Sequence, residues 1–250
     1  MKKKTIAISG GLGKIGFALA LKCSANFNVL IGDNNLKKYK SLSKQIQKNN
    51  IKFYKGDLTK EREISNFINF GKKNFQQIDC TIHCCYPKNK NWDIDFIQLD
   101  QQNLNKTICD HLGGAIIYSQ KFIKYFLKIG GGKLIHFSSI HGVKTPKFDH
   151  YKNLKITSPI GYATSKSGII SMTKYLAKFY GTKNIQINCI SPGGIKSDQN
   201  KIFKRRYNNS CLSKGLLDVK DLFSTVFFLL NDQSKFINGQ NIIIDDGWSL

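Results

Sequence analysis

The sequence predicts a three-layer α/β/α fold in which helices cover both faces of a doubly wound parallel sheet. Short apolar runs alternate with longer amphipathic stretches along the 250 residues, and no repeat or Pro/Ser-rich linker interrupts them. Regular alternation of strand and helix implies parallel strands joined by right-handed crossovers. A chain of this length also fits within a single hydrophobic core. We therefore expect one domain over residues 1–250.

Each predicted strand is a short apolar run, and each predicted helix repeats its apolar residues with a helical period. In a sheet of this kind, ligands bind at the carboxyl ends of the strands, near the point where the strand order reverses. Residues that directly follow strands are therefore the candidates for a functional site. The predicted strands span residues 5–9, 28–31, 51–55, 80–84, 133–138, 185–190 and 241–244. The predicted helices span residues 15–25, 36–48, 64–73, about 99–127, 161–180 and 218–230.

A glycine-rich turn follows the first strand and opens the first helix. Its glycines allow a tight turn and let the backbone approach a pyrophosphate, whose charge meets the exposed N–H groups at the helix start. This arrangement is typical of the Rossmann fold, although glycine-rich turns also serve packing alone. We expect the turn to bind a dinucleotide. The expected cofactor contacts here are Gly10, Leu12, Gly13, Lys14, Ile15 and Gly16.

Acidic residues follow the second and third strands. Asp33 can accept hydrogen bonds from ribose hydroxyls and repel a 2′-phosphate, which favours NAD over NADP. Lys14 and Lys37 keep NADP open as the alternative cofactor. Asp57 and Leu58 are expected to contact the adenine edge. A helix cap is the alternative interpretation of both aspartates, since Asp is common at that position.

A tyrosine and a lysine four residues apart carry the predicted chemistry. Tyr162 and Lys166 lie on one face of a predicted helix. A phenol with a pKa of about 10 is a poor base at neutral pH, and an adjacent cation favours its ionised form. This spacing also occurs by chance, but Ser139 follows one neighbouring strand and Pro192-Gly193 follows another. Together these residues predict an acid/base at the carboxyl edge of the sheet.

In this order and spacing, the motifs resemble those of the short-chain dehydrogenase/reductase family, from residue 5 to the closing segment 238–247. The resemblance implies an oxidoreductase that interconverts an alcohol and a carbonyl, with a nicotinamide cofactor supplying the hydride chemistry. It implies that Tyr162 is the general acid/base and that Lys166 binds the nicotinamide ribose and lowers the tyrosine pKa. It further implies that Ser139 holds the reacting oxygen. The residues expected to orient the nicotinamide carboxamide are Ile195 and Ser197, after Pro192 and Gly193.

Three segments depart from the family pattern. The glycine spacing is closer to that of extended family members. The segment from His83 to Tyr86 replaces an Asn-Asn-Ala-Gly motif, so we expect Cys84 and Cys85 in the cofactor pocket and Tyr86 near the substrate. His111 occupies the place of the helix asparagine that completes the family's proton relay. Histidine can pass protons near neutral pH, so we include it in the catalytic set; a buried structural histidine is the alternative.

The substrate is expected to be a sugar or a sugar derivative. Within the family, the stretches at 138–143, 157–162 and 190–195 resemble those of bacterial members from surface-glycan, flagellin-glycan and nonulosonic-acid pathways. The stretch between Ser139 and Tyr162 is about ten residues longer than is usual in the family, and inserted loops beside a site often carry function. We therefore expect an inserted loop at about 143–160 to overhang the substrate, next to a lid at about 196–217.

Basic residues cluster in both of these segments. His141, Arg205 and Arg206 are the expected substrate contacts, and guanidinium groups suit phosphate or carboxylate. An anionic or nucleotide-linked sugar is therefore the expected small-molecule substrate. A neutral substrate beneath a solvated basic lid is the alternative. The other cations of the two segments are Lys144, Lys147, Lys152, Lys155, Lys196, Lys201 and Lys204.

The net charge of the chain also raises the alternative of a nucleic-acid-binding protein. The chain has 39 Lys and Arg against 16 Asp and Glu, which gives a net charge of +23 and suggests nucleic acid as a partner. The lysines are spread over many elements, and no RNA-recognition or helix-turn-helix signature accompanies them. This pattern favours a chain-wide bias over a nucleic-acid-binding face. A nucleotide-binding regulatory protein with weak catalysis is the other alternative to an active enzyme.

The cysteines and the hydropathy of the sequence indicate in which cellular compartment the protein resides. The seven cysteines form no CxxC pair, so neither a disulfide framework nor a zinc site is indicated, and no metal is expected. No stretch approaches the ~20 apolar residues of a membrane helix. We therefore expect a cytoplasmic protein without a membrane partner. The family resemblance implies a homo-oligomer, either a tetramer or a dimer.

Overall fold

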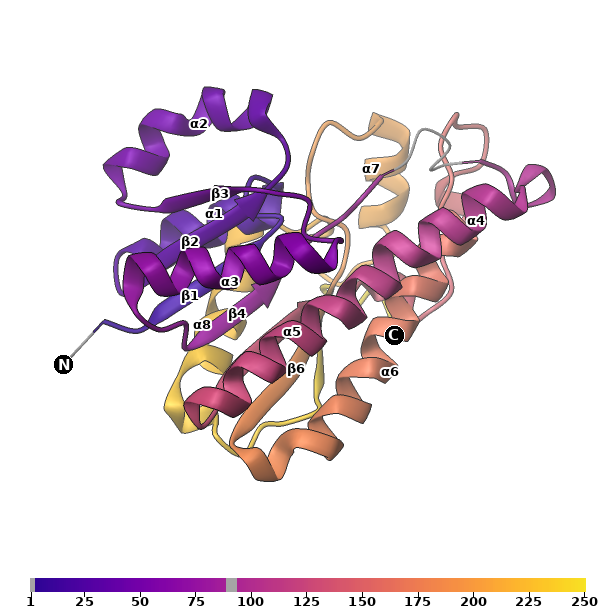
Figure 1. Ribbon diagram of the computed structural model, residues 1–250. Coiled ribbons are helices and arrows are strands. Elements are labelled where there is room, and N and C mark those ends of the chain that lie inside the picture. Colours follow the sequence, from indigo (N-terminus) through magenta and orange to yellow (C-terminus); the bar gives the residue numbers. More distant parts are fainter. Residues whose placement is uncertain (1–2, 89–93) are drawn as a thin grey trace.

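A parallel sheet runs through the centre of the molecule (Figure 1). The computed structural model describes residues 3–88 and 94–250. Its seven strands lie in the order β3-β2-β1-β4-β5-β6-β7, so the strand order reverses between β1 and β4. This confirms the predicted doubly wound fold. The strands are β1 Thr5–Ser9, β2 Asn28–Asp33, β3 Lys52–Lys55, β4 Cys80–His83, β5 Gly132–Phe137, β6 Ile185–Pro192 and β7 Asn241–Ile244.

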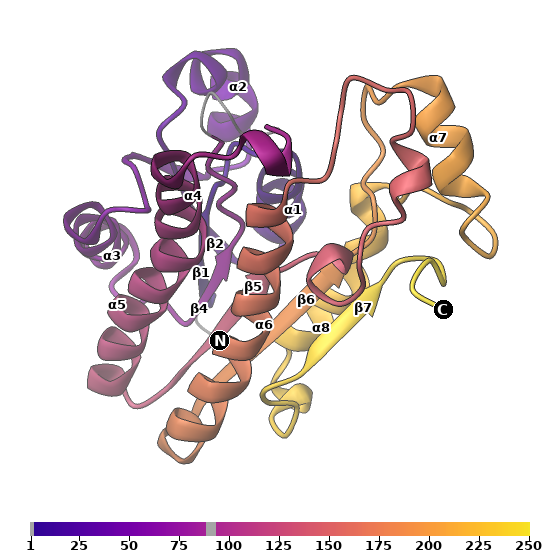
Figure 2. The same cartoon turned by 90° about the vertical axis from the view of Figure 1, so that its right-hand side faces the viewer.

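Two helical layers enclose the sheet (Figure 2). One apolar cluster packs α1, α2 and α8 against the sheet, and a second packs α3, α5 and α6 against it. Burial of both sheet faces explains why the strands are near-continuous apolar runs. The helices are α1 Lys14–Ser24, α2 Leu36–Lys48, α3 Glu61–Phe75, α4 Gln101–Ile108, α5 Gly114–Ile129, α6 Ile160–Tyr180, α7 Lys201–Asn208 and α8 Phe223–Leu230.

Two helical details differ from the sequence prediction. The long helix expected at about 99–127 is divided by a π-helical turn, Cys109–Gly113, between α4 and α5. Such turns insert one extra residue into a helix and are frequent at functional sites. The predicted lid at 196–217 contains the helix α7, which begins where the Asn200 side chain accepts a hydrogen bond from the Ile202 N–H. Hydrophobic periodicity did not reveal this helix because it has only eight residues.

The glycine turn after β1 requires residues without a Cβ. Gly10 has φ +64°, and a Cβ there would lie 2.7 Å from the Cys84 carbonyl oxygen. A Cβ on Gly16 would lie 2.4 Å from the Gly10 carbonyl oxygen. The Gly13 N–H donates to that same carbonyl at 2.9 Å, and α1 starts at the next residue. The turn therefore packs tightly against the end of β4 and exposes the first N–H groups of α1 at the switch point.

All seven cysteines are free. Within residues 3–88 and 94–250, no helix is long and apolar enough to cross a bilayer. The same residues contain no group of three or more His, Cys, Asp or Glu side chains placed to hold a metal ion.

We expect Gly16→Ala to destabilise the fold, because the added methyl group would contact the Gly10 carbonyl at 2.4 Å. Overpacking of this kind costs about 1–3 kcal/mol in the free energy of unfolding, which urea denaturation followed by circular dichroism would measure. Gly113→Ala is the matched control, since the nearest atom to its new Cβ lies 3.9 Å away. Equal destabilisation by both substitutions would contradict the packing argument.

Candidate active site

A pocket of about 110 Å³ lies beside the glycine turn, at the switch point of the sheet. It brings together six of the predicted site residues from four different segments of the chain. The pocket is lined by Gly10, Gly32, Asp33, Asn34, Gly56, Asp57, Leu58, Thr59, Cys85, Tyr86 and Pro87.

Asp33 connects the glycine turn to the start of α2. Its half-buried carboxylate accepts hydrogen bonds from the Leu12 N–H and the Asn35 N–H, both at 3.0 Å. The N-cap of α2 is Asn35, whose side chain accepts from the Lys38 N–H, so Asp33 is not the cap of that helix. Two backbone donors fix the orientation of the Asp33 carboxylate at the edge of the pocket.

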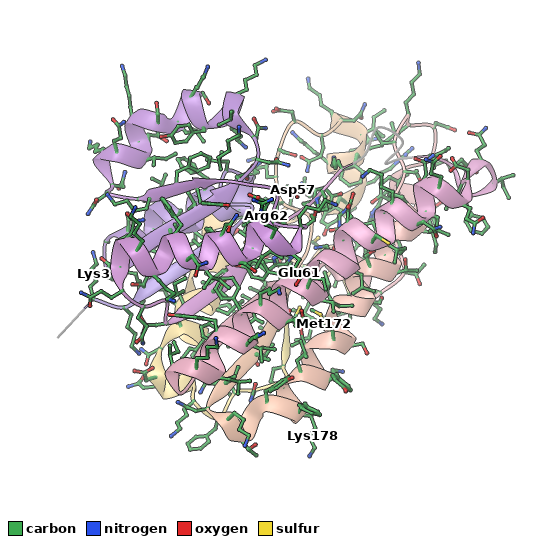
Figure 3. The ribbon with its side chains drawn as sticks, viewed as in Figure 1. Lys3, Asp57, Glu61, Arg62, Met172 and Lys178 are labelled. Carbon is green, nitrogen blue, oxygen red and sulfur yellow. The ribbon has the colours of Figure 1, made fainter. Side chains whose placement is uncertain are left out.

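Asp57 lies just before the first turn of α3, close to Glu61 and Arg62 (Figure 3). Its carboxylate accepts hydrogen bonds from the N–H and the hydroxyl of Thr59, at 3.1 and 2.8 Å. The N-cap position of α3 is Lys60, so Asp57 shapes the turn that precedes the helix. Asp57 therefore has a local structural role in addition to its place in the pocket wall.

The segment after β6 is held against the glycine turn. The Lys14 ammonium group donates a hydrogen bond to the Lys196 carbonyl. Gln199, which the sequence analysis did not single out, accepts from the Ser197 N–H and donates to the Ile195 carbonyl, both at 2.7 Å. The structure thus places Ile195 and Ser197 near the start of α1, with their backbone bridged by a glutamine side chain.

The three predicted catalytic side chains at the end of β5 meet. The Tyr162 hydroxyl is hydrogen-bonded to the Ser139 hydroxyl. The Lys166 ammonium group lies 5.7 Å from the centre of the Tyr162 ring and donates to the Phe137 carbonyl at 2.9 Å. The Ser138 hydroxyl donates to the Lys166 carbonyl at 2.7 Å, which fastens α6 to the end of β5. A proton donor and a buried cation therefore stand side by side at the sheet edge.

Burial sets the pKa values of this group. It lowers the pKa of Lys166 to about 8. It raises the pKa of Tyr162 above its ordinary value, while the Ser139 hydrogen bond acts in the opposite direction. The expected lowering of the tyrosine pKa by Lys166 is therefore not the direction found here. Desolvation of the phenol dominates, and the ammonium group is directed to the Phe137 carbonyl.

His111 lies in the π-helical turn and reaches the site through aromatic contacts. Its ring centre is 5.3 Å from that of Tyr86, which in turn lies 5.5 Å from that of Tyr162, both edge to face. The imidazole is hydrogen-bonded to the Pro87 carbonyl. Burial, and secondarily the charge of Lys166, lowers the His111 pKa to about 4. His111 is therefore neutral near pH 7 and has one N–H donor and one acceptor nitrogen.

In the segment predicted to replace the family's Asn-Asn-Ala-Gly motif, His83 is buried, Cys84 and Cys85 are partly buried, and Tyr86 is exposed. His83 Nδ1 lies 2.8 Å from the Ser9 hydroxyl, and its ring packs at 4.4 Å on that of Tyr118. Burial raises the pKa of Cys84, and it raises the pKa of Cys85 to about 12, so both thiols stay protonated. Cys85 lines the pocket, whereas Cys84 contributes the carbonyl that lies against Gly10.

The inserted loop and the lid pack on each other beyond the carboxyl edge of the sheet (Figure 2). The Arg206 guanidinium donates to the Lys152 carbonyl at 2.6 Å. His150 Nε2 lies 2.9 Å from the Ser210 hydroxyl. The inserted loop and the lid therefore contact each other directly. The arginine pair is divided, because Arg206 braces the loop while Arg205 is exposed on the last turn of α7.

Trp248 joins these segments to the site, although the sequence analysis did not name it. Its indole ring is buried, stacks on Tyr207 with a centre distance of 5.8 Å, and lies 5.8 Å from His141. The Lys147 ammonium group sits 4.9 Å from the indole centre. In the sequence, the only sign of this residue is a tryptophan that follows a strand and an acidic turn. Its position beside His141 follows from contacts between distant segments.

Comparison with known proteins agrees with this geometry. A family model described as enoyl-(acyl carrier protein) reductase matches residues 13–249. The chain is 34% identical over 255 residues to post-translational flagellin modification protein A of Campylobacter coli, covering 100% of both proteins. It is 29% identical over 249 residues to a 3-oxoacyl-(acyl-carrier-protein) reductase of Rickettsia felis, covering 98% of this chain and 96% of that protein.

A solved structure supports the same assignment. The crystal structure of a short chain dehydrogenase from Leptospira borgpetersenii with bound NAD+ matches with a TM-score of 0.87 and 29% identity, covering 100% of this chain and 94% of that one. The TM-score shows that the two chains share the fold described above. The chain therefore belongs to the short-chain dehydrogenase/reductase family of NAD(P)-dependent oxidoreductases.

Proposed function

We propose that this enzyme uses NAD to interconvert an alcohol and a carbonyl on a sugar or sugar derivative in bacterial surface-glycan biosynthesis. The observation that carries the proposal is the contact of the Tyr162 and Ser139 hydroxyls beside the buried Lys166 ammonium group. Similarity to a flagellin modification protein supports the glycan context. The intact catalytic geometry favours an active enzyme over a nucleotide-binding regulator.

The residues at the switch point fit a dinucleotide. Gly10 and Gly16 leave no space for a Cβ, as expected of a backbone cradle for a pyrophosphate. The Asp33 carboxylate, fixed at the pocket edge, would accept from the adenosine ribose and repel a 2′-phosphate. Lys14 is engaged by the Lys196 carbonyl and is therefore less available to a 2′-phosphate. These features favour NAD, with NADP as the alternative.

The protein's own groups supply binding and proton transfer. When bound, the nicotinamide ring exchanges a hydride with the substrate carbon. Tyr162 would give a proton to the substrate oxygen during reduction or take it during oxidation, and Ser139 would hydrogen-bond the same oxygen. Lys166, fixed by the Phe137 carbonyl, would hold the nicotinamide ribose. The adenine edge would contact Asp57 and Leu58, and the carboxamide would contact the segment from Pro192 to Ser197, which includes Gly193 and Ile195.

His111 is the proposed exit for the proton. Its neutral imidazole is hydrogen-bonded to the Pro87 carbonyl and touches Tyr86, which touches Tyr162. Ring contacts carry no proton, so a relay through His111 would need water molecules that link Tyr162 to the acceptor nitrogen of the imidazole and the imidazole to solvent. A purely structural role for this buried histidine is the alternative.

The positive charge of the inserted loop and the lid favours an anionic or nucleotide-linked sugar as the substrate. Lys147 lies on Trp248, Arg205 is exposed, and Arg206 donates to the Lys152 carbonyl of the inserted loop. By contrast, other lysines, such as Lys3 and Lys178, lie on distant parts of the surface (Figure 3). This spread does not favour a nucleic-acid-binding face.

The proposed protein is a cytoplasmic homo-oligomer. Seven free cysteines suit the reducing cytoplasm. Tyr175 and Phe179 on α6 are 66% and 62% exposed and stack on each other, with ring centres 6.2 Å apart. An exposed aromatic pair on a long helix supports a homo-oligomer, either a dimer or a tetramer.

Tyr162→Phe should lower turnover by about a hundredfold or more, because it removes the proton carrier and keeps the ring. NAD binding, measured by calorimetry, should persist. Lys166→Met should weaken both turnover and NAD binding. Tyr180→Phe, at the opposite end of α6, is the matched control and should behave like the parent. Parent-like turnover of Tyr162→Phe would exclude Tyr162 as the acid/base.

NAD should bind more tightly than NADP. Asp33→Ala should narrow the difference in Kd by about tenfold, which corresponds to ~1.4 kcal/mol, because it removes the repulsion of the 2′-phosphate. Calorimetric titration of both nucleotides into the parent and the variant measures this. Asp232→Ala removes the same charge from an exposed position paired with Lys4 and serves as the control. Equal or tighter NADP binding by the parent would refute the cofactor assignment.

The substrate class can be tested with NAD+ and glucitol, glucitol 6-phosphate, gluconate and a nucleotide-linked sugar. We expect higher kcat/KM for the anionic compounds. Replacing Arg205 and Arg206 together by Gln should lower those values about tenfold, because guanidinium groups bind phosphate and carboxylate, and should lower that of glucitol much less, through loss of the bond from Arg206 to the Lys152 carbonyl. Lys128 and Lys178 replaced together by Gln form the charge-matched control far from the site. Equal losses for neutral and anionic substrates would exclude anion binding by the lid.

A further inference from the structure

His141 stands next to the proposed catalytic pair but has no part in the proton transfer described above. We propose that His141 binds the substrate by presenting its Nε2–H to an oxygen next to the reacting carbon, and that Ser158 and Tyr151 of the inserted loop position it. The proposal rests on the proposed function and deepens it. It assigns the loop a direct role in substrate selection.

A chain of hydrogen bonds leads from the inserted loop to His141. The Tyr151 hydroxyl is hydrogen-bonded to Ser158. The Ser158 hydroxyl lies 2.9 Å from His141 Nδ1. The His141 N–H donates to the Ser139 hydroxyl oxygen at 3.2 Å, so both residues belong to one turn. The loop therefore fixes an imidazole on the same turn that carries Ser139.

The ring of His141 lies directly beside Tyr162. The two ring centres are 6.2 Å apart and the rings meet edge to face, while Trp248 lies 5.8 Å away. Ser158 takes the Nδ1 side of the imidazole. Within residues 3–88 and 94–250, Nε2 makes no hydrogen bond and is not among the fully buried side-chain atoms. It is therefore the nitrogen of His141 that a substrate can reach.

The direction of the hydrogen bonds decides what Nε2 offers. In the proposed arrangement, Ser158 donates its one proton to His141 Nδ1, because an imidazole nitrogen is a better acceptor than a phenol oxygen, and Ser158 accepts from Tyr151. The ring proton is then on Nε2. Burial lowers the pKa of His141 to about 4, and the charge of nearby His150 acts in the same direction, so the ring is neutral near pH 7. His141 is thus a fixed N–H donor.

A fixed donor on the turn that carries Ser139 selects a particular class of substrate. Ser139 and His141 would contact neighbouring oxygens of one molecule, as in a vicinal diol or an α-hydroxy carbonyl. A site built to hydrogen-bond a substrate group discriminates strongly against an analogue that lacks the group, because the protein's polar atom is then left unpaired. Simple secondary alcohols should therefore be poor substrates.

The tautomer can be measured without turnover. Nuclear magnetic resonance of the full chain labelled with 15N-histidine reports which ring nitrogen is protonated, and the chain has five histidines. His141→Gln assigns the His141 signals. We expect the Nε2–H form in the parent and in Thr157→Ala, which changes the residue next to Ser158 and lies outside the hydrogen-bonded chain. Ser158→Ala and Tyr151→Phe should shift His141 toward the Nδ1–H form. A parent in the Nδ1–H form, or no shift in Ser158→Ala, would overturn the proposal.

Kinetics with NAD+ test the substrate class. The parent should oxidise butane-2,3-diol with a higher kcat/KM than butan-2-ol, and Ser158→Ala should reduce this ratio about tenfold, mainly through KM. Thr157→Ala should keep the ratio. Equal kcat/KM values for the two alcohols in the parent would overturn the assignment of His141 to substrate binding. Failure to oxidise any alcohol would instead contradict the proposed function, and the tautomer measurement would still decide whether the loop positions His141.

Discussion

The burial of the Lys166 ammonium group is the constraint on which the site depends. A buried cation is costly unless it is hydrogen-bonded, and Lys166 is held by the Phe137 carbonyl at 2.9 Å. This bond fixes α6 against the end of β5 and so places Tyr162 on Ser139. The same charge adds to burial in lowering the pKa values of His83, His111 and His136. One buried charge therefore fixes the geometry at this edge and adds to the burial that keeps these histidines neutral.

Local patterns made much of this arrangement predictable from sequence. The strands, the glycine turn and the Tyr162–Lys166 spacing depend on residues close together in the chain, so periodicity and motif spacing captured them. The π-helical turn around His111, the bridge made by Gln199 and the packing of Trp248 depend on contacts between distant segments. Short-range patterns contain no information about such contacts, and these features emerged only in the folded chain.

The basic residues near the lid also show how far the sequence predicts contacts between distant segments. Arg205 and Arg206 were predicted as substrate contacts because adjacent guanidinium groups suit anions, but Arg206 donates to the Lys152 carbonyl, and Lys14 of the glycine turn donates to the Lys196 carbonyl of the lid. Both cations therefore also act as braces between segments. Lys147, by contrast, rests on the face of Trp248, where the indole ring attracts a cation. The charge of the two segments led to the prediction of an anionic substrate, whereas the contacts that each cation makes depend on the groups that face it in the fold.

The resemblance predicts that His83 and His111 occupy positions of family asparagines, and burial near Lys166 gives a physical reason why histidine fits at both. A neutral imidazole has one donor and one acceptor, as an asparagine amide also does, whereas an imidazolium has donors only. Burial and the Lys166 charge keep His83 and His111 neutral. His83 can then pair with the Ser9 hydroxyl, and His111 with the Pro87 carbonyl. The departures at these positions therefore preserve an asparagine-like hydrogen-bonding capacity, which is why they are compatible with intact geometry at Tyr162.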